Sequence, residues 1–228
     1  MKNEFNNRTT QDYLKHIFNL TQIYETANTN SLAERMGIKA ATVTEMLGRL
    51  STTTPPLVHY KKYQGATLTE EGRNAALRVI RRHRLIETYL VTELGYGWDT
   101  IHEEACRLEH VVSDEFEQRI AEALGNPQYS PHGEPIPADD LSMPPAFKTT
   151  LAAAEPNARV EVLQVPDTDS ALLRHLWEAG IYPGNHLSIL ARSEFDGNLT
   201  IQPDTNAMPI TLGPKVTSKI YIHILESS

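Results

Sequence analysis

The spacing of apolar residues predicts a helix-turn-helix near the start of the chain. Apolar positions recur at helical intervals over residues 9–26 and again over residues 39–50. Between these segments, residues 31–34 (Ser-Leu-Ala-Glu) have the pattern of a capping box that opens a short helix, and Gly37 stands where such a helix would end. A short helix, a turn containing glycine and a second helix together predict the motif.

After residue 56 the pattern changes to short extended segments, which predict a β-hairpin. Residues 57–61 (Leu-Val-His-Tyr-Lys) and 66–68 (Ala-Thr-Leu) flank a turn that contains Gly65. A hairpin that follows a helix-turn-helix corresponds to the wing of a winged helix. Two packed helices with no functional partner are the plain structural alternative, but Lys61 and Lys62 near the hairpin tip favour DNA binding.

Two long helices are predicted in the middle of the chain. A helical pattern covers residues 70–93 and starts after Thr69, which is a suitable cap. Residues 95–97 (Gly-Tyr-Gly) break this pattern, and a second helix is expected over residues 100–124. Both helices have wide apolar faces, which predicts a helical dimer interface.

The last part of the chain is predicted to be a linker followed by a small β-domain. Eight of the fourteen prolines fall within residues 126–166, a composition typical of an extended, semi-rigid linker. Beyond it, segments rich in Val, Ile, Leu and Tyr predict strands around one short helix at residues 170–179, in a β-barrel of roughly 70 residues. The predicted strands are residues 159–164, 186–191, 199–202 and 219–225.

These elements predict an α+β multidomain protein. We expect a winged helix-turn-helix DNA-binding domain in residues 1–74 and a helical domain in residues 75–140. A Pro-rich linker is expected in residues 141–157, and the β-domain in residues 158–228.

The charge of the chain is compatible with a nucleic-acid partner only through its distribution. The formal net charge is −8, but residues 1–75 hold nine Lys or Arg against seven Asp or Glu, whereas the rest holds twelve against twenty-two. A near-neutral segment on an acidic body can bind DNA through a local patch. The chain has no apolar run of about 18 residues, no apolar signal core at its N-terminus and one cysteine. We therefore expect a cytoplasmic protein without a membrane span or an internal disulfide.

The segment 102–110 carries the most informative chemistry. His102, Cys106, Glu109 and His110 would lie on adjoining turns of one helix face. Imidazole, thiolate and carboxylate groups are common ligands of divalent transition metals. Any one of these residues alone would be interpreted as a surface group or, for Cys106, as a small buried side chain. The clustering of several donor types instead predicts a metal site, and His83-x-x-x-Glu87 adds a donor pair on the preceding helix.

A metal-dependent enzyme is an alternative, as is a metal-buffering protein whose winged helix serves protein contacts. The zincin motif requires His-Glu-x-x-His, whereas residues 102–106 are His-Glu-Glu-Ala-Cys. Glu103 is explained as the partner of Thr100 in a capping box. No candidate nucleophile is evident, so we expect that the chain is not an enzyme.

Several segments resemble the diphtheria toxin repressor family of iron- and manganese-dependent transcriptional repressors, which includes the manganese transport regulators. The central match is residues 104–115 (Glu-Ala-Cys-Arg-Leu-Glu-His-Val-Val-Ser-Asp-Glu), with residues 82–85 (Arg-His-Arg-Leu) before it and residues 130–137 (Ser-Pro-His-Gly-Glu-Pro-Ile-Pro) after it. The start of the chain matches approximately, in residues 10–14 (Thr-Gln-Asp-Tyr-Leu). The β-rich tail resembles the SH3-like (FeoA-like) domain of the longer members, so the resemblance covers nearly the whole chain.

The resemblance implies two metal sites and makes residues 75–140 the metal-binding and dimerisation domain. The primary, activating site would use Asp12, Cys106, Glu109 and His110. The second site would use His83, Glu87, His102 and, from the tail domain, Asp169. Asp169 also has the position of an N-cap for the helix at residues 170–179. His132, in Ser-Pro-His-Gly, is a weaker candidate for an additional site.

Departures from the family pattern bear on the metal. Asp12 stands where iron-responsive members have Met and manganese-responsive members have Asp, whereas Cys106 keeps the thiol of the iron type. Lys15 stands where the short manganese members have an additional carboxylate ligand, and Leu172 where the iron type has an amide ligand. A hard carboxylate favours Mn²⁺, while the thiol opposes that preference. We expect Mn²⁺, with Fe²⁺ as the alternative and Co²⁺, Ni²⁺, Zn²⁺ or Cd²⁺ as further ions that bind in vitro.

The predicted partner is double-stranded DNA with a palindromic operator, bound by a homodimer that represses genes of metal uptake and homeostasis. The helix at residues 39–50 would enter the major groove, and the wing would contact phosphates. The residues expected to contact DNA are Lys39, Ala41, Thr42, Thr44 and Glu45 on the helix and Lys61, Lys62 and Tyr63 on the wing.

Overall fold

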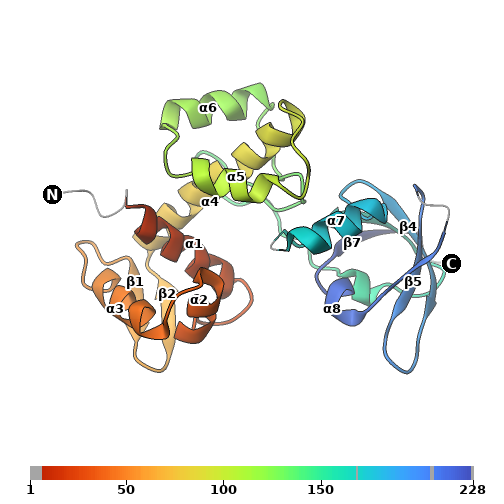
Figure 1. The fold of residues 1–228 in the computed structure, drawn as a ribbon, viewed down its shortest axis with the longest axis horizontal. Coiled ribbons are helices and arrows are strands. Elements are labelled where there is room, and N and C mark those ends of the chain that lie inside the picture. Colours follow the sequence, from red (N-terminus) through yellow and green to blue (C-terminus); the bar gives the residue numbers. More distant parts are fainter. Residues whose placement is uncertain (1–6, 168, 206–207, 227–228) are drawn as a thin grey trace. The chain divides into compact units, whose positions relative to one another are not determined.

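Helices and one β-hairpin form the first half of the chain, and a five-stranded antiparallel sheet lies in the second half (Figure 1). The structure is a computed structural model that describes residues 7–167, 169–205 and 208–226. Residues 1–6, where we expect no signal core, lie outside the described part. The chain divides into two compact units. The first unit is the chain up to His83 with Leu108–Ser113 and Pro137–Ser142, and the second unit is the remainder.

The first unit begins with three helices, α1 (Arg8–Thr21), α2 (Thr29–Met36) and α3 (Ala40–Leu50). The side chain of Asn7 caps α1 by accepting hydrogen bonds from the backbone N–H groups of Thr9 and Thr10. Helix α2 starts earlier than predicted, because Asn28 is its cap and accepts from the N–H of Ser31. The predicted capping box at Ser31 is therefore wrong by three residues. Gly37 ends α2 with φ of 64°, as predicted.

The predicted wing is confirmed as an antiparallel hairpin of β1 (Val58–Lys61) and β2 (Gly65–Leu68). Ala27 and Ala66 exchange backbone hydrogen bonds, which attaches the hairpin to the loop before α2. Helix α4 (Glu70–Thr92) follows at once, and the hydroxyl of Thr69 accepts from the N–H of Gly72, so the predicted cap is also confirmed. A buried apolar core joins these elements. Its members include Leu14, Ile17, Leu47, Leu50, Leu57 and Leu77.

The single helix predicted over residues 100–124 is wrong. The chain instead forms α5 (Ile101–Leu108) and α6 (Asp114–Ala123), separated by a turn in which Val111 and Val112 donate to the carbonyl of Leu108. The second helix starts with acidic residues in its first turn, which interact favourably with the positive end of the helix dipole. Residues 113–115 (Ser-Asp-Glu) therefore have the pattern of a helix start. The apolar residues that continue before them led to the prediction of one uninterrupted helix.

The second unit ends in the predicted SH3-like domain, a five-stranded antiparallel sheet with strand order β6-β5-β4-β3-β7. The strands are β3 (Arg159–Gln164), β4 (His186–Arg192), β5 (Leu199–Pro203), β6 (Ile210–Leu212) and β7 (Tyr221–Glu226). The helices are η2 (Leu151–Ala153), α7 (Ser170–Glu178) and α8 (Pro214–Thr217). Strand β6 and helix α8 were not predicted, because each is too short for a periodic pattern. Alternating residues of the strands form an apolar core with Leu173 and Leu176 of α7.

Two glycines in helices of the first unit give a matched test of its packing. A Cβ atom on Gly72 would overlap the carbonyl oxygen of Leu57, whereas nothing lies within 4 Å of a Cβ on Gly48. We expect Gly72→Ala to lower the free energy of unfolding by about 1–3 kcal/mol through overpacking. Gly48→Ala should raise it by up to about 1 kcal/mol through helix propensity. Urea denaturation of both variants checks this, and equal effects of the two changes would contradict the packing.

Candidate metal centre and nucleic-acid interface

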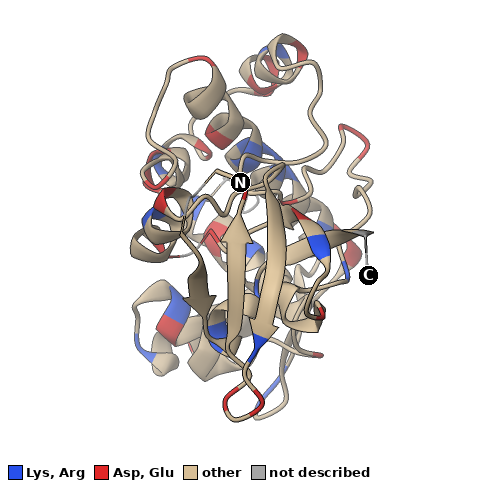
Figure 2. Ribbon diagram, turned by 90° about the vertical axis from the view of Figure 1, so that its right-hand side faces the viewer, with Lys and Arg blue, Asp and Glu red and all other residues tan. Residues whose placement is uncertain are grey.

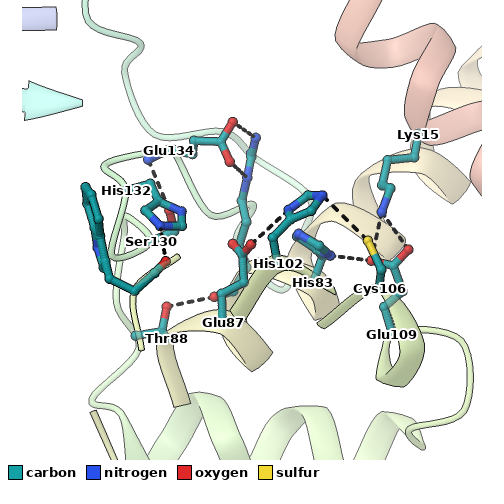
Figure 3. A network of polar contacts seen from close by, with 12 residues as sticks. Lys15, His83, Glu87, Thr88, His102, Cys106, Glu109, Ser130, His132 and Glu134 are labelled. Carbon is teal, nitrogen blue, oxygen red and sulfur yellow. Dashed lines mark hydrogen bonds and ion pairs between the residues drawn. The ribbon is translucent and has the colours of Figure 1, made fainter. Parts of the chain in front are cut away.

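The centre of the first unit is a buried carboxylate surrounded by nitrogen atoms. Glu109 has no exposed surface and lies in the turn after α5. Lys15 of α1 places its Nζ 2.6 Å from Oε1 and 2.9 Å from Oε2 of Glu109, and His83 Nδ1 of α4 lies 2.5 Å from Oε2 (Figure 3). The Nε2 of His110 lies 3.1 Å from Oε1. The carboxylate therefore receives contacts from α1, α4 and its own turn.

His110 connects this carboxylate to α1. Its Nε2 lies 2.9 Å from Oδ1 of Asp12, and its Nδ1 lies 2.7 Å from Oε1 of Gln11. Both ring nitrogens thus lie close to oxygen atoms, an environment that favours the doubly protonated, charged ring. Burial disfavours the charged ring, but the hydrogen bonds to Asp12 and Glu109 outweigh it and raise the pKa of His110 to about 9.

The ionised state of Glu109 is stabilised by the same contacts. Burial alone would raise the pKa of this carboxyl group. The hydrogen bonds from His110 and His83, with the charges of His83 and Lys15, outweigh burial and hold the pKa of Glu109 below its usual range. An anion is therefore kept in the interior of the unit.

The donor set in the first unit fits a divalent metal ion. One ligand atom each from Asp12, Glu109 and His110 lie within 4.8 Å of one another. Two carboxylates and an imidazole suit first-row divalent ions. Gln11 accepts from the second nitrogen of the His110 ring, an arrangement that orients metal-ligating histidines. Cys106, the remaining predicted ligand, is part of α5 in the second unit.

A separate group of donors lies in the second unit. Ligand atoms of Glu87, His102 and Asp167 lie within 4.8 Å of one another. Glu87 is fully buried, and its Oε1 lies 3.2 Å from Nδ1 of His102. On the other side of that ring, Nε2 of His102 lies 3.7 Å from the sulfur of Cys106 (Figure 3). The structure thus brings together two of the residues predicted for the second site.

Asp169 does not take part in this group. Its carboxylate accepts from the N–H groups of Ala171 and Leu172 and so caps α7, the alternative that the sequence also allowed. The aspartate that joins Glu87 and His102 is Asp167, two residues earlier. Sequence reasoning missed it because the family resemblance pointed to Asp169, and the proximity of Asp167 to Glu87 and His102 depends on how the chain packs.

His132 is buried but belongs to none of the donor groups among the described residues. Its Nε2 lies 3.1 Å from the carbonyl oxygen of Trp98, and the two rings meet edge to face with centroids 4.7 Å apart. Burial lowers the pKa of His132, which favours the neutral ring. Its role in an additional metal site therefore stays a prediction from the sequence.

A buried ion pair lies beside the second donor group. Arg84 of α4 forms a two-point contact with Glu134, with distances of 2.9 and 3.2 Å, and donates to the carbonyl of Pro135. Burial and a hydrogen bond with Asp167 outweigh the charge of Arg84 and raise the pKa of Glu134 to about 7. The contact holds the segment after His132 against α4, and nothing in the sequence spacing indicated it.

The candidate nucleic-acid interface consists of α3 and the wing. Lys39, Ala41, Thr42 and Glu45 are exposed, and Thr44 is half-buried with its hydroxyl donating to the carbonyl of Ala40. At the wing tip Tyr63 is 93% exposed, and the Nζ of Lys62 lies 5.2 Å from the centre of its ring. The predicted residues are therefore accessible to a partner. Acidic and basic positions are otherwise interspersed along the elements (Figure 2).

The described residues contain no helix with the length and apolar character that a membrane span requires.

Comparison with known families divides the chain into matching regions. Residues 7–66 match the "Iron dependent repressor, N-terminal DNA binding domain", residues 69–138 the "Iron dependent repressor, metal binding and dimerisation domain", and residues 149–224 the "FeoA domain".

Relatives match over most of their length. The iron-dependent repressor IdeR of Mycobacterium tuberculosis is 33% identical over 195 residues, which cover 79% of this chain and 83% of IdeR. The diphtheria toxin repressor of Corynebacterium diphtheriae is 31% identical over 85% of this chain and 88% of its own. A solved manganese-dependent transcriptional repressor in complex with manganese is 39% identical, covers 95% of this chain and all of its own, and has a TM-score of 0.86.

These relatives are transcriptional repressors, so the enzyme alternative has no support. The matches include a DNA-binding domain and a metal-binding and dimerisation domain in the order that the sequence predicted. The chain therefore belongs to the iron-dependent repressor family of metal-dependent transcriptional repressors.

Proposed function

We propose that this chain is a repressor that binds a palindromic operator as a homodimer when Mn²⁺ or Fe²⁺ occupies the site at Glu109. The observation that carries the proposal is the meeting of Asp12 from α1 with Glu109 and His110 from the turn after α5. The genes under control would be those of metal uptake and homeostasis, and the protein would act in the cytoplasm.

The proposed primary site consists of Asp12, Glu109, His110 and Cys106. The first three offer hard or borderline donors from the first unit, and the thiol of Cys106 is the fourth ligand that the family resemblance implies. A bound divalent cation would neutralise the negative charge of the two carboxylates. Gln11 would keep the His110 ring oriented through its Nδ1.

Coupling to DNA follows from the position of Asp12. Helix α1 packs against α2 and β2, so it belongs to the same body as α3 and the wing. A metal that binds Asp12, Glu109 and His110 would fix α1 on the turn Leu108–Ser113. It would thereby fix the orientation of α3, the helix proposed to enter the major groove. The bound state would shift an existing ensemble toward the form that fits DNA.

We infer a second metal site at Glu87, His102 and Asp167, with His83 retained as a candidate from the sequence. The donors Glu87 and His102 are held 3.2 Å apart in the second unit. Asp167 replaces Asp169 in the proposal because Asp169 already caps α7. The metal-dependent relatives include structures described with bound Zn²⁺ and Cd²⁺, so several ions are expected to bind in vitro.

The DNA contacts that we propose include few basic side chains. Helix α3 would enter the major groove, with Ala41 against a thymine methyl and Thr42 and Thr44 near phosphates. Lys61 and Lys62 on the wing would contact the backbone. In a two-fold dimer the two α3 helices would be about 34–36 Å apart, or a multiple of that spacing.

Replacing Glu109 with Gln tests the primary site with little change of shape. Removing the charge should weaken Mn²⁺ binding by more than about a hundredfold, beyond the usual effect of residues that only support a ligand. Operator DNA should then no longer be retained on addition of metal. Metal affinity by equilibrium dialysis and retention by gel shift, with and without chelator, measure this. Glu115→Gln, an exposed glutamate of α6, is the control. Equal DNA retention with and without metal in Glu109→Gln would refute the proposal.

The pKa of His110 sets the pH dependence of metal binding. Because that pKa is raised to about 9, His110 keeps its Nε2 proton at neutral pH, and a metal must displace it. Affinity for Mn²⁺ should rise by up to about tenfold per pH unit and level off near pH 9.

The folding stability of the metal-free protein should change with pH in the opposite direction to the metal affinity. A pKa raised above the unfolded value of 6.5 stabilises the fold below pH 6.5, and this contribution is lost as the pH rises through about 9. Anaerobic dialysis and thermal unfolding at pH 6.5, 7.5 and 8.5 check both trends. An affinity that does not change with pH would contradict the assignment.

Asp167 and Asp169 form a matched pair for the second site. Asp167→Ala should reduce the number of Mn²⁺ ions bound per chain by one, because it removes a ligand. Asp169→Ala should leave the number unchanged and lower the free energy of unfolding by about 1 kcal/mol through loss of the cap. Metal content after gel filtration and urea denaturation separate the two effects. The opposite pattern would return the ligand to Asp169.

A further inference from the structure

Lys15 is a buried lysine in an unusual place for a metal-binding unit. It is 7% exposed, and its ammonium group contacts both oxygens of Glu109, a proposed metal ligand with no exposed surface. Lysine is seldom buried unless it is paired. An ammonium group has three donors and no acceptor, so it cannot itself ligate a metal while it is charged.

Nitrogen atoms contact both oxygens of the Glu109 carboxylate. A carboxylate has about four lone-pair sites. Oxygen Oε1 is contacted by Lys15 Nζ at 2.6 Å and by His110 Nε2 at 3.1 Å. Oxygen Oε2 is contacted by His83 Nδ1 at 2.5 Å and by Lys15 Nζ at 2.9 Å. A metal that coordinates Glu109 must therefore displace one of these nitrogens.

Lys15 is the group that any such metal meets. It contacts both oxygens of Glu109, so coordination through either oxygen encounters it. His110 is itself a proposed ligand and need not leave the site. An ammonium group and a divalent cation on the same carboxylate also repel each other, and the repulsion is weakly screened in a buried site.

We propose that Lys15 is an internal cation that neutralises Glu109 in the metal-free protein and competes with the metal for that carboxylate. The inference rests on the proposed metal site at Glu109. Lys15 thereby sets the metal concentration at which the site fills: it stabilises the empty site and weakens metal binding by the same interaction. The residue thus determines the threshold of the response and leaves the donor set unchanged.

The test compares Mn²⁺ binding by Lys15→Met and by the unchanged full-length chain. Lys15→Met removes the charged terminal nitrogen and keeps an unbranched side chain that is one atom shorter. We expect its dissociation constant for Mn²⁺, measured by equilibrium dialysis without DNA, to fall by about tenfold or more, within the range known for residues around metal ligands. The metal-free variant should unfold at a lower temperature, and Mn²⁺ should raise that temperature more than in the unchanged chain.

Further variants keep the result interpretable. Lys15→Arg retains the charge and should restore weak Mn²⁺ binding. Lys15→Gln removes the charge with a smaller change in polarity, and it replaces Lys15→Met if that variant does not fold. Lys219→Met removes an exposed lysine before β7 and should leave the dissociation constant unchanged. If the uncharged Lys15 variants that fold bind Mn²⁺ no more tightly than the unchanged chain, the proposal that Lys15 competes with the metal is rejected.

Failure of this inference is distinguishable from failure of the metal site itself. If Glu109→Gln binds Mn²⁺ as tightly as the unchanged chain, the proposed site is wrong and the role of Lys15 with it. If Glu109→Gln loses Mn²⁺ while Lys15→Met leaves the affinity unchanged, the site stands and the competition is rejected.

Discussion

The first unit depends on the burial of one negative charge. Glu109 is fully buried and ionised, and transfer of a carboxylate from water into a protein interior costs several kcal/mol before it is paired. Lys15, His83 and His110 provide that pairing from α1, α4 and the turn Leu108–Ser113. The pairing of this buried carboxylate with cationic groups therefore holds together segments that are distant in sequence, in addition to apolar packing.

This requirement explains how a metal at the proposed site would control DNA binding. The carboxylate needs a cation in every state, and the protein offers one of its own through Lys15. Any change in which cation serves Glu109 alters the contacts of α1, which packs against α2 and β2. Because packed elements have discrete arrangements, a small change at the carboxylate can select between orientations of the whole winged helix-turn-helix.

Local patterns were sufficient for most of the fold. The wing, the long helix α4 and most strands of the SH3-like sheet follow from periodicity, caps and turn residues. The error between α5 and α6 arose because apolar residues continue through Val111 and Val112, while the break depends on a turn. Short elements such as β6 have too few residues to show any period.

The site was only partly accessible from sequence, for a different reason. The ligand types and their spacing around Glu109 are visible in the chain, but the contact between Lys15 and Glu109 joins residues 94 positions apart. Spacing along one helix cannot indicate such a contact, because it depends on how α1 and the turn pack together. Asp167 was missed because its proximity to Glu87 and His102 also depends on packing, whereas the resemblance pointed to Asp169, which caps α7.

We expect the choice between manganese and iron to depend more on Cys106 than on Asp12. The donors gathered in the first unit are two carboxylates and one imidazole, and such a set gains affinity steadily from Mn²⁺ to Fe²⁺ and the later metals. Affinity alone would therefore never favour Mn²⁺, and an internal competitor such as Lys15 would weaken all of these ions. A weaker site responds to the ion that is abundant, whereas a thiolate ligand adds affinity for softer ions. We therefore expect the metal response to be set by two opposing residues, Lys15 raising the concentration required and Cys106 lowering it for every ion softer than Mn²⁺.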